Sequence, residues 1–119
     1  MDKVLNIAYL GDAVYEVYIR NYLLTKDIYN SGELQKASLK FVSAKSQRRH
    51  LERLIDNNIL TEEELDLIRK GRNAKGTKCK SADIITYHLA TGLEYLFGVL
   101  YLRKDIERIE KIISYIVSE

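Results

Sequence analysis

The sequence predicts an all-α protein, and three observations support this. The chain of 119 residues contains no proline and only six glycines, so little in it interrupts a helix. No stretch alternates apolar and polar residues between Asn-Gly or Asp-Gly turns, the pattern that indicates a β-hairpin. A chain of this length builds one core rather than two. We therefore expect a single helical domain, residues 1–119, with about six helices.

The first helix is predicted from about Val4 to Leu24, where apolar residues occupy most of the circumference. A helix of this kind is normally central in its domain. A short second helix is expected after Ser31. The third begins near Ser43 or Ala44 and ends at the polar run Asp56-Asn57-Asn58.

Capping residues predict where the other three helices begin. Thr61, with Glu64 three residues later, has the pattern of a capping box and opens the fourth helix. Ser81 is placed to cap the fifth helix, which runs to about Leu102. Asp105 is placed to cap the last helix.

The stretch from Ile84 to Leu102 is apolar enough to raise the question of a membrane span. Glu94 lies in its middle, however, and a charge at that depth costs a few kcal/mol. We expect a buried core helix and no membrane association.

Composition excludes several classes of protein. Nineteen Lys and Arg against 17 Asp and Glu leave a net charge of +2, which excludes a histone-like protein. One cysteine, Cys79, excludes a disulfide framework and a multi-cysteine zinc module. The first residues lack the basic and apolar segments of a secretory signal. These features predict a reduced, cytoplasmic protein.

Two of the predicted apolar helices each contain carboxylates. Asp12 lies in the first helix, with Glu16 one turn later on the same face. Glu94 is the only acidic or basic side chain between Ile84 and Leu102, if His88 is neutral. A buried carboxylate needs a cation, a hydrogen-bond network or a water-filled cleft.

Glycines next to these acids predict that the two helices cross closely. Gly11 precedes Asp12, and Gly92 and Gly98 flank Glu94. Two interpretations remain open at this point. Either the acids pair with lysines at an ordinary helix crossing, or Asp12 and Glu94 face each other and hold a hard cation such as Mg²⁺ or Mn²⁺.

Basic residues are concentrated in two windows that contain no acid. Five lie between Leu34 and Leu51 and six between Leu67 and Ala82, which together make eleven of the 19. The second window contains two glycines and leads into the helix with Glu94, an arrangement suited to the phosphates of a nucleic acid. A solvated charged face is the alternative. The candidate RNA-binding residues are Arg72, Lys75, Lys78 and Lys80, and more weakly Lys45, Arg48 and Arg49.

Four segments in order along the chain resemble the catalytic domain of ribonuclease III, and most closely its small branch, Mini-ribonuclease III. They are Tyr-Leu-Gly-Asp-Ala-Val-Tyr-Glu at 9–16, Val-Ser-Ala-Lys-Ser-Gln at 42–47, Arg-Lys-Gly-Arg-Asn-Ala-Lys at 69–75, and Thr-Gly-Leu-Glu-Tyr-Leu-Phe-Gly-Val-Leu-Tyr-Leu at 91–102.

The resemblance implies a homodimeric, Mg²⁺-dependent endonuclease for double-stranded RNA, with Mn²⁺ as a substitute ion and 5′-phosphate and 3′-hydroxyl products. It also implies a task in the maturation of 23S ribosomal RNA, with a large-subunit ribosomal protein as a further partner. By position, Asp12 and Glu94 correspond to the catalytic, metal-binding carboxylates. Glu16 and Thr91 are candidates to contact the waters around the ion.

The chain departs from full-length ribonuclease III at two positions. Additional acids of the larger family are replaced by Ala8 and Thr91, which leaves two carboxylates where the family has more. This departure sustains an alternative function, a catalytically inactive RNA-binding or ribosome-associated helical module.

Overall fold

The computed structural model describes residues 3–28, 30–74 and 83–119, and within them it contains six helices and no strand. The helices are α1 (Lys3–Leu23), α2 (Ser31–Val42), α3 (Ala44–Asp56), α4 (Glu62–Arg72), α5 (Ile84–Leu102) and α6 (Ile106–Val117). The all-α prediction is confirmed. No helix among the described residues is long and apolar enough to cross a membrane.

Local capping explains most of the helix starts. The Ser43 side chain accepts a hydrogen bond from the Ser46 amide, and Thr61 and Glu64 form the predicted capping box. Asp105 caps α6, also as predicted. The expected cap of α5 was wrong, because Asp83 accepts the Thr86 amide at 3.0 Å, whereas Ser81 lies outside the described residues.

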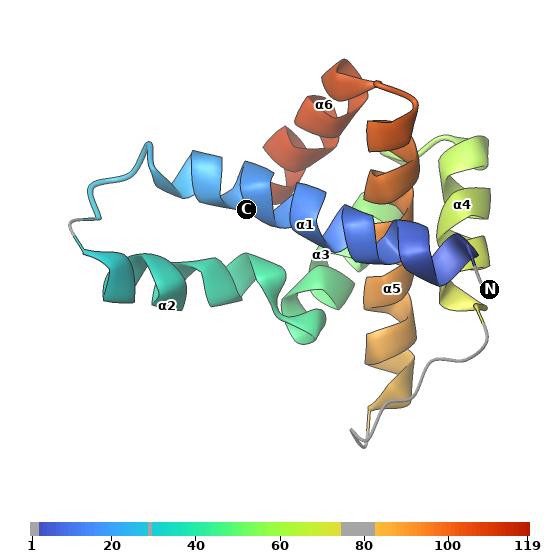
Figure 1. Cartoon of the computed structure of the whole chain (residues 1–119), viewed down its shortest axis with the longest axis horizontal. Coiled ribbons are helices and arrows are strands. Elements are labelled where there is room, and N and C mark those ends of the chain that lie inside the picture. Colours follow the sequence, from blue (N-terminus) through green and yellow to red (C-terminus); the bar gives the residue numbers. More distant parts are fainter. Residues whose placement is uncertain (1–2, 29, 75–82) are drawn as a thin grey trace.

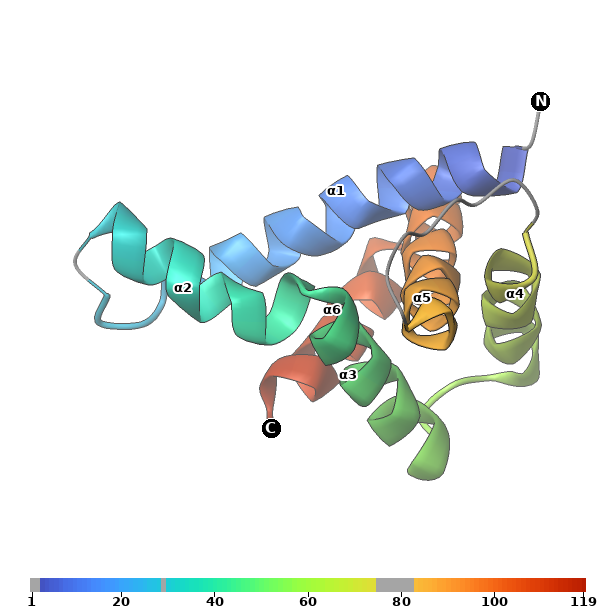
Figure 2. The ribbon, with the colours of Figure 1, turned by 90° about the horizontal axis from the view of Figure 1, so that it is seen from below.

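Helix α5 is the centre of the fold. It contacts α1, α3, α4 and α6, and eleven of its 19 residues are buried. Figure 2 shows it nearly end-on, between α1 on one side and α3 on the other, with α4 beside it. Helices α1 and α2 continue past α5 as an antiparallel pair (Figure 1). This arrangement explains why α5 shows almost no polar face in the sequence.

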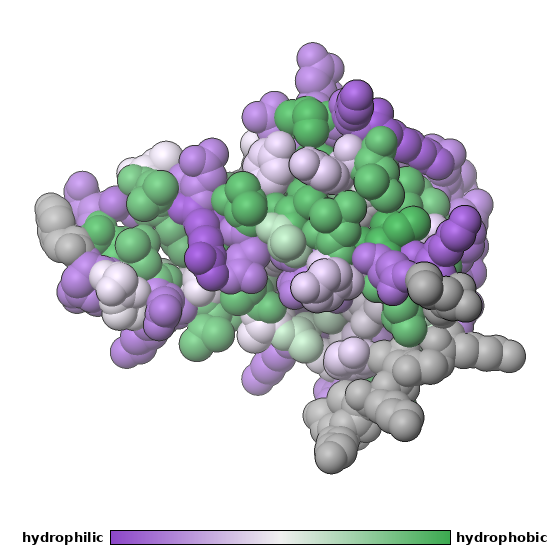
Figure 3. All heavy atoms as spheres, in the orientation of Figure 1, coloured by the Kyte–Doolittle hydropathy of each residue, from purple (hydrophilic) through white to green (hydrophobic). Residues whose placement is uncertain are grey.

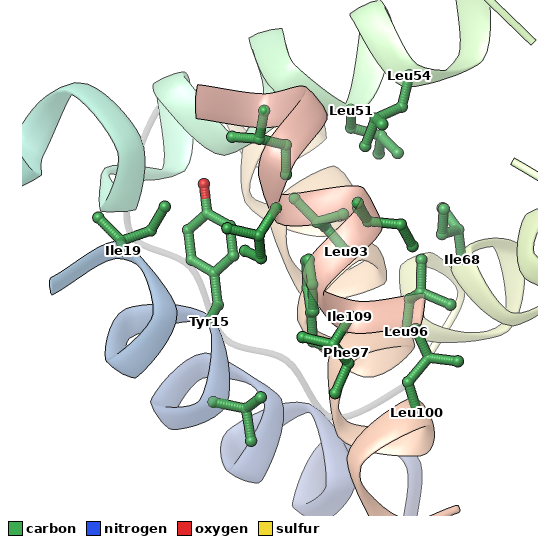
Figure 4. Packing of buried hydrophobic residues seen from close by; sticks show 14 of the residues in the cluster. Tyr15, Ile19, Leu51, Leu54, Ile68, Leu93, Leu96, Phe97, Leu100 and Ile109 are labelled. Atoms are coloured by element: carbon green, nitrogen blue, oxygen red, sulfur yellow. The ribbon is translucent and has the colours of Figure 1, made fainter. Parts of the chain in front are cut away.

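One continuous core joins these helices. Fully buried Tyr15 and Phe97 lie with their ring centroids 5.3 Å apart, so that α1 and α5 meet through aromatic packing. Figure 4 shows these rings among aliphatic side chains from α3, α4, α5 and α6. Each buried Leu, Ile or Phe contributes about 1.5–3 kcal/mol to folding.

Small residues set how closely the helices approach. A Cβ at Gly11 would overlap the carbonyl oxygen of Glu94, and one at Gly98 would overlap that of Ile7. Helices α1 and α5 therefore cross backbone to backbone, as predicted. Gly92 does not belong to this crossing, which corrects the sequence-based assignment: it faces α4, where an added Cβ would lie 2.7 Å from the carbonyl oxygen of Ile68.

Candidate functional site

The crossing of α1 and α5 brings Asp12 and Glu94 together. Gly11 packs on the backbone of Glu94, so the neighbouring Asp12 side chain lies beside the Glu94 side chain, close enough for its charge to act on that carboxyl group. Both residues are partly buried. The interpretation in which these acids pair with lysines finds no support, because no ion pair to either acid occurs among the described residues.

The electrostatics of the pair are those of a site that lacks positive charge. Burial raises the pKa of Glu94 from its ordinary value of 4.5 to about 8, and the negative charge of Asp12 contributes to the rise. Two adjacent carboxyl groups in such a place are difficult to ionise together. A divalent cation between them would remove this cost, because it favours the ionised form of both.

The donor set fits a hard cation that retains most of its water. Both groups are carboxylates, which are the ligands that Mg²⁺ and Mn²⁺ prefer. No cluster of three or more His, Cys, Asp or Glu suited to a metal occurs in the described parts of the chain. Mg²⁺ is often held by one or two carboxylates together with substrate phosphates, so a pair of carboxylates is compatible with this ion.

The surroundings of Ala8 are unsuited to a further acid at this position of α1. It is one turn before Asp12 and 3% exposed, and it packs with Tyr95 and Val99 in a small apolar cluster. A carboxylate there would be buried among hydrocarbon, without a partner.

The two residues predicted to contact the waters of the ion have protein partners in this structure. Glu16 forms an ion pair with Arg20, whose Nε donates to the Glu16 carboxylate at 3.1 Å. The buried hydroxyl of Thr91 donates to the carbonyl oxygen of Tyr87 at 3.0 Å. Their contact with an ion stays a prediction.

Gln47 is part of the site, and sequence reasoning missed it. The residue is 2% exposed, and its Nε2 donates to Oε2 of Glu94 at 3.4 Å and to the carbonyl oxygen of Val42 at 3.1 Å. This interaction lowers the pKa of Glu94, against the larger effect of burial. The sequence offered one signal: Gln47 ends the 42–47 segment of the resemblance, in which only the neighbouring cations were considered.

Three predicted RNA-binding residues surround an open hollow of about 700 Å³ between the start of α3 and the start of α5. Lys45 is exposed and has no ion-pair partner among the described residues. Arg48 donates to the Thr86 hydroxyl at 2.9 Å, and Arg49 pairs with Glu119 at 2.7 Å. Both arginines thus make contacts within the protein. Among these three cations, Lys45 is therefore the most available to bind a phosphate.

This hollow and the carboxylate pair are linked through α3 and α5. Tyr87, which lines it, precedes Glu94 by seven residues on α5, an axial distance of about 10 Å. On the α3 side, Lys45 lies two residues before Gln47, which contacts Glu94.

The second basic window is described only at its beginning. Arg72 is exposed at the end of α4, where its Nε donates to the Asn73 side chain at 3.4 Å. The predicted RNA-binding residues Lys75, Lys78 and Lys80 lie outside the described residues. Their role stays a prediction.

Comparison with known proteins gives consistent matches over nearly the whole chain. Residues 5–105 match the family model of the ribonuclease III domain. The Mini-ribonuclease 3 proteins of Streptococcus pneumoniae and Staphylococcus aureus are 37% and 42% identical to this chain, with 95% and 96% of it aligned to 89% and 86% of theirs. A crystal structure of a Fusobacterium nucleatum protein aligns with a TM-score of 0.85 at 35% identity, covering 98% of this chain and 93% of the other.

Proposed function

Since this chain belongs to the ribonuclease III family, in its Mini-ribonuclease 3 branch, we propose that Asp12 and Glu94 hold the Mg²⁺ with which it cuts RNA. The chain is an endoribonuclease that acts on double-stranded RNA. The observation that carries the assignment of the site is the pair of adjacent carboxyl groups at the crossing of α1 and α5.

The proposed mechanism divides the work between the cation and the chain. When bound, Mg²⁺ would neutralise charge on the scissile phosphate and lower the pKa of the water molecule used for in-line attack. Asp12 and Glu94 hold the ion at the crossing, whose backbone contact fixes their separation. Lys45 and the cations of residues 69–80 bind the RNA backbone. We expect products with a 5′-phosphate and a 3′-hydroxyl.

Cutting both strands of a duplex requires two sites, and we propose a homodimer that provides them. Tyr9, Ala13 and Val17 are spaced by four residues on α1 and are exposed, Tyr9 to 84% and Val17 to 63%. Figure 3 shows apolar residues gathered in the middle of the face that α1 crosses. A second copy on this face would lie next to Asp12, which immediately precedes Ala13, and would bring the two sites close together.

The proposed substrate in the cell is precursor 23S ribosomal RNA, which the protein would cut in the cytoplasm. Mn²⁺ is proposed as a substitute ion and a large-subunit ribosomal protein as a further partner. This part of the proposal rests on family resemblance alone. Recognition of the stem would proceed mainly through the A-form shape and 2′-hydroxyl groups.

The test is cleavage of an end-labelled RNA duplex by the purified protein, with Mg²⁺ and with EDTA. We expect Asp12→Asn to abolish cutting, because it removes a ligand of the ion. Duplex binding should be kept, because the cations that contact phosphate are unchanged. Asp27→Asn, at an exposed acid of the α1–α2 connection, is the matched control and should cut normally. If wild type binds the duplex without cutting it in Mg²⁺ and in Mn²⁺, the inactive RNA-binding module replaces this proposal.

A further inference from the structure

Gln47 is a buried polar side chain, and only part of its amide group has hydrogen-bond partners. Its Nε2 has two acceptors, the Glu94 carboxylate and the carbonyl oxygen of Val42. Its Oε1 is buried and has no hydrogen-bond partner among the described residues. Both neighbours of Nε2 are acceptors, so the orientation of the amide is fixed: the nitrogen faces Glu94.

The segment that carries Gln47 is itself held in place. The Val42 carbonyl lies at the junction of α2 and α3, where the Ser43 side chain caps α3 by accepting the Ser46 amide at 3.2 Å. The Ser46 hydroxyl donates to the carbonyl oxygen of Leu39 at 3.1 Å. On the α1 side, the hydroxyl of fully buried Tyr15 donates to the carbonyl oxygen of Phe41 at 2.8 Å. The amide of Gln47 therefore starts from a fixed anchor.

Packing alone does not account for this residue. A leucine would fill a similar volume and would remove the buried Oε1, an oxygen without a partner that costs stability. Besides its hydrogen bond to the Val42 carbonyl, the amide provides a hydrogen bond to one oxygen of Glu94 from a third helix, α3. Without this hydrogen bond, the Glu94 side chain would lose conformational freedom when an ion binds, which weakens binding.

We propose that Gln47 is a positioning residue that holds Oε2 of Glu94, so that the other oxygen of this carboxylate is directed to the cation shared with Asp12. The inference rests on the proposed function, because it takes Glu94 to be a ligand of that cation. Gln47 is 2% exposed, so its role does not involve contact with the substrate. It acts through the carboxylate, in the way that hydrogen-bond partners of metal ligands usually do.

The test variant is Gln47→Leu, which keeps the approximate volume and removes the donor. The first readout is Mn²⁺ affinity without RNA, measured from the free Mn²⁺ signal in electron paramagnetic resonance. We expect binding to be weaker by about tenfold, since loss of such partners usually costs ten- to a hundredfold in metal affinity. The second readout is cleavage, in which the Mg²⁺ concentration for half-maximal rate should rise and KM for the duplex should stay constant.

Ser46→Ala is the matched control. It removes a buried hydroxyl that anchors the same junction to Leu39, and it leaves Glu94 untouched. It should lower the melting temperature without changing Mn²⁺ affinity, which separates a general weakening of α3 from the specific contact. Gln47→Met serves the same purpose as Gln47→Leu should the latter fail to fold.

The outcomes distinguish this inference from the proposed function. If wild type neither binds Mn²⁺ nor cuts duplex RNA, the proposed function fails. If wild type does both and folded Gln47→Leu or Gln47→Met binds Mn²⁺ within about twofold of wild type, only the role of Gln47 is overturned. A loss of affinity in the Gln47 variants together with an unchanged Ser46→Ala supports it.

Discussion

Replacing Glu94 by glutamine should stabilise the protein in the absence of metal while it abolishes cleavage. The substitution is nearly isosteric, and the new amide retains an oxygen to accept from Gln47 and gains a donor toward Asp12. What it removes is the ionisation of a half-buried carboxyl beside another acid. The increase in stability is expected only at pH values at which Glu94 of the wild-type protein would be charged.

The sign follows from the direction of the pKa shift. The pKa of Glu94 is raised in the folded protein, from 4.5 to about 8, through burial and the charge of Asp12. The folded state therefore binds this proton more tightly than the unfolded state does. The resulting stability is complete below pH 4.5 and is lost as pH rises from there through about 8. Glutamine carries no such proton and has no such loss.

The size follows from the same shift. One pKa unit corresponds to about 1.4 kcal/mol, so the complete shift sets an upper limit of roughly 5 kcal/mol. Movement of the two side chains and entry of water relieve part of this cost. We expect Glu94→Gln to raise the free energy of unfolding by about 2 kcal/mol near pH 9, and to change it little near pH 4.

The assay is urea unfolding in EDTA at these two pH values, for wild type, Glu94→Gln and the control Asp27→Asn at one protein concentration. Mg²⁺ added near pH 9 should stabilise wild type and leave Glu94→Gln unchanged, because a ligand that binds only the folded state stabilises it. The reasoning is refuted if Glu94→Gln is no more stable than wild type near pH 9 in EDTA.

Four further substitutions test the fold and the RNA interface. Gly11→Ala should prevent folding or reduce soluble yield strongly, because its Cβ overlaps a carbonyl oxygen of α5. Gly32→Ala, whose Cβ meets only a side-chain oxygen at 3.4 Å, should be neutral or stabilising by about 0.5 kcal/mol. Arg108→Met should cost about 3 kcal/mol in urea unfolding near pH 7, because buried Glu64 loses the two hydrogen bonds from Arg108, of 2.6 and 2.7 Å. Lys45→Ala should weaken duplex binding and reduce its salt dependence by about one unit of slope, measured by filter binding across salt concentrations.

The result for Arg108→Met should depend on pH. Burial alone would raise the pKa of Glu64, but hydrogen bonds from Arg108 and the Thr61 amide outweigh it, so the pKa lies below 4.5. This stabilisation is present above pH 4.5 and is lost as pH falls through the lowered pKa of the folded state. The cost of the substitution should therefore shrink in acid. An equal cost at pH 7 and at pH 3 contradicts the assigned role of the pair.

The helices and the main acids of the site were accessible to sequence reasoning because their signals are local. Thr61 and Glu64 cap α4 within four residues, and Asp105 caps α6 in the same way. Asp12 and Glu94 stood out because each is an acid in an otherwise apolar helix, and two such helices normally cross at the centre of a fold.

The remaining features depend on long-range contacts or on helical phase. Gln47 reaches Glu94 across 47 positions of the chain, and its own surroundings in sequence are basic and polar. Gly92 was assigned to the wrong crossing, although it lies six residues before Gly98 and so points roughly 120° away from it on the helix. Asp83 caps α5 in place of Ser81, because Asp and Ser are both common at helix starts and residue type alone does not choose between two positions so close together.

The central claim is that Asp12 and Glu94 act together on one cation, and a double-mutant cycle on the cleavage rate tests it most directly. The rates of Asp12→Asn, Glu94→Gln and the double variant are compared on one RNA duplex in Mg²⁺, under single-turnover conditions. Residues that form one unit give strongly non-additive losses. We predict that each single variant loses nearly all cleavage and that the double variant loses little more. A shared ion is contradicted if the rate losses of the two single variants multiply in the double variant, or if a single variant cuts at the wild-type rate.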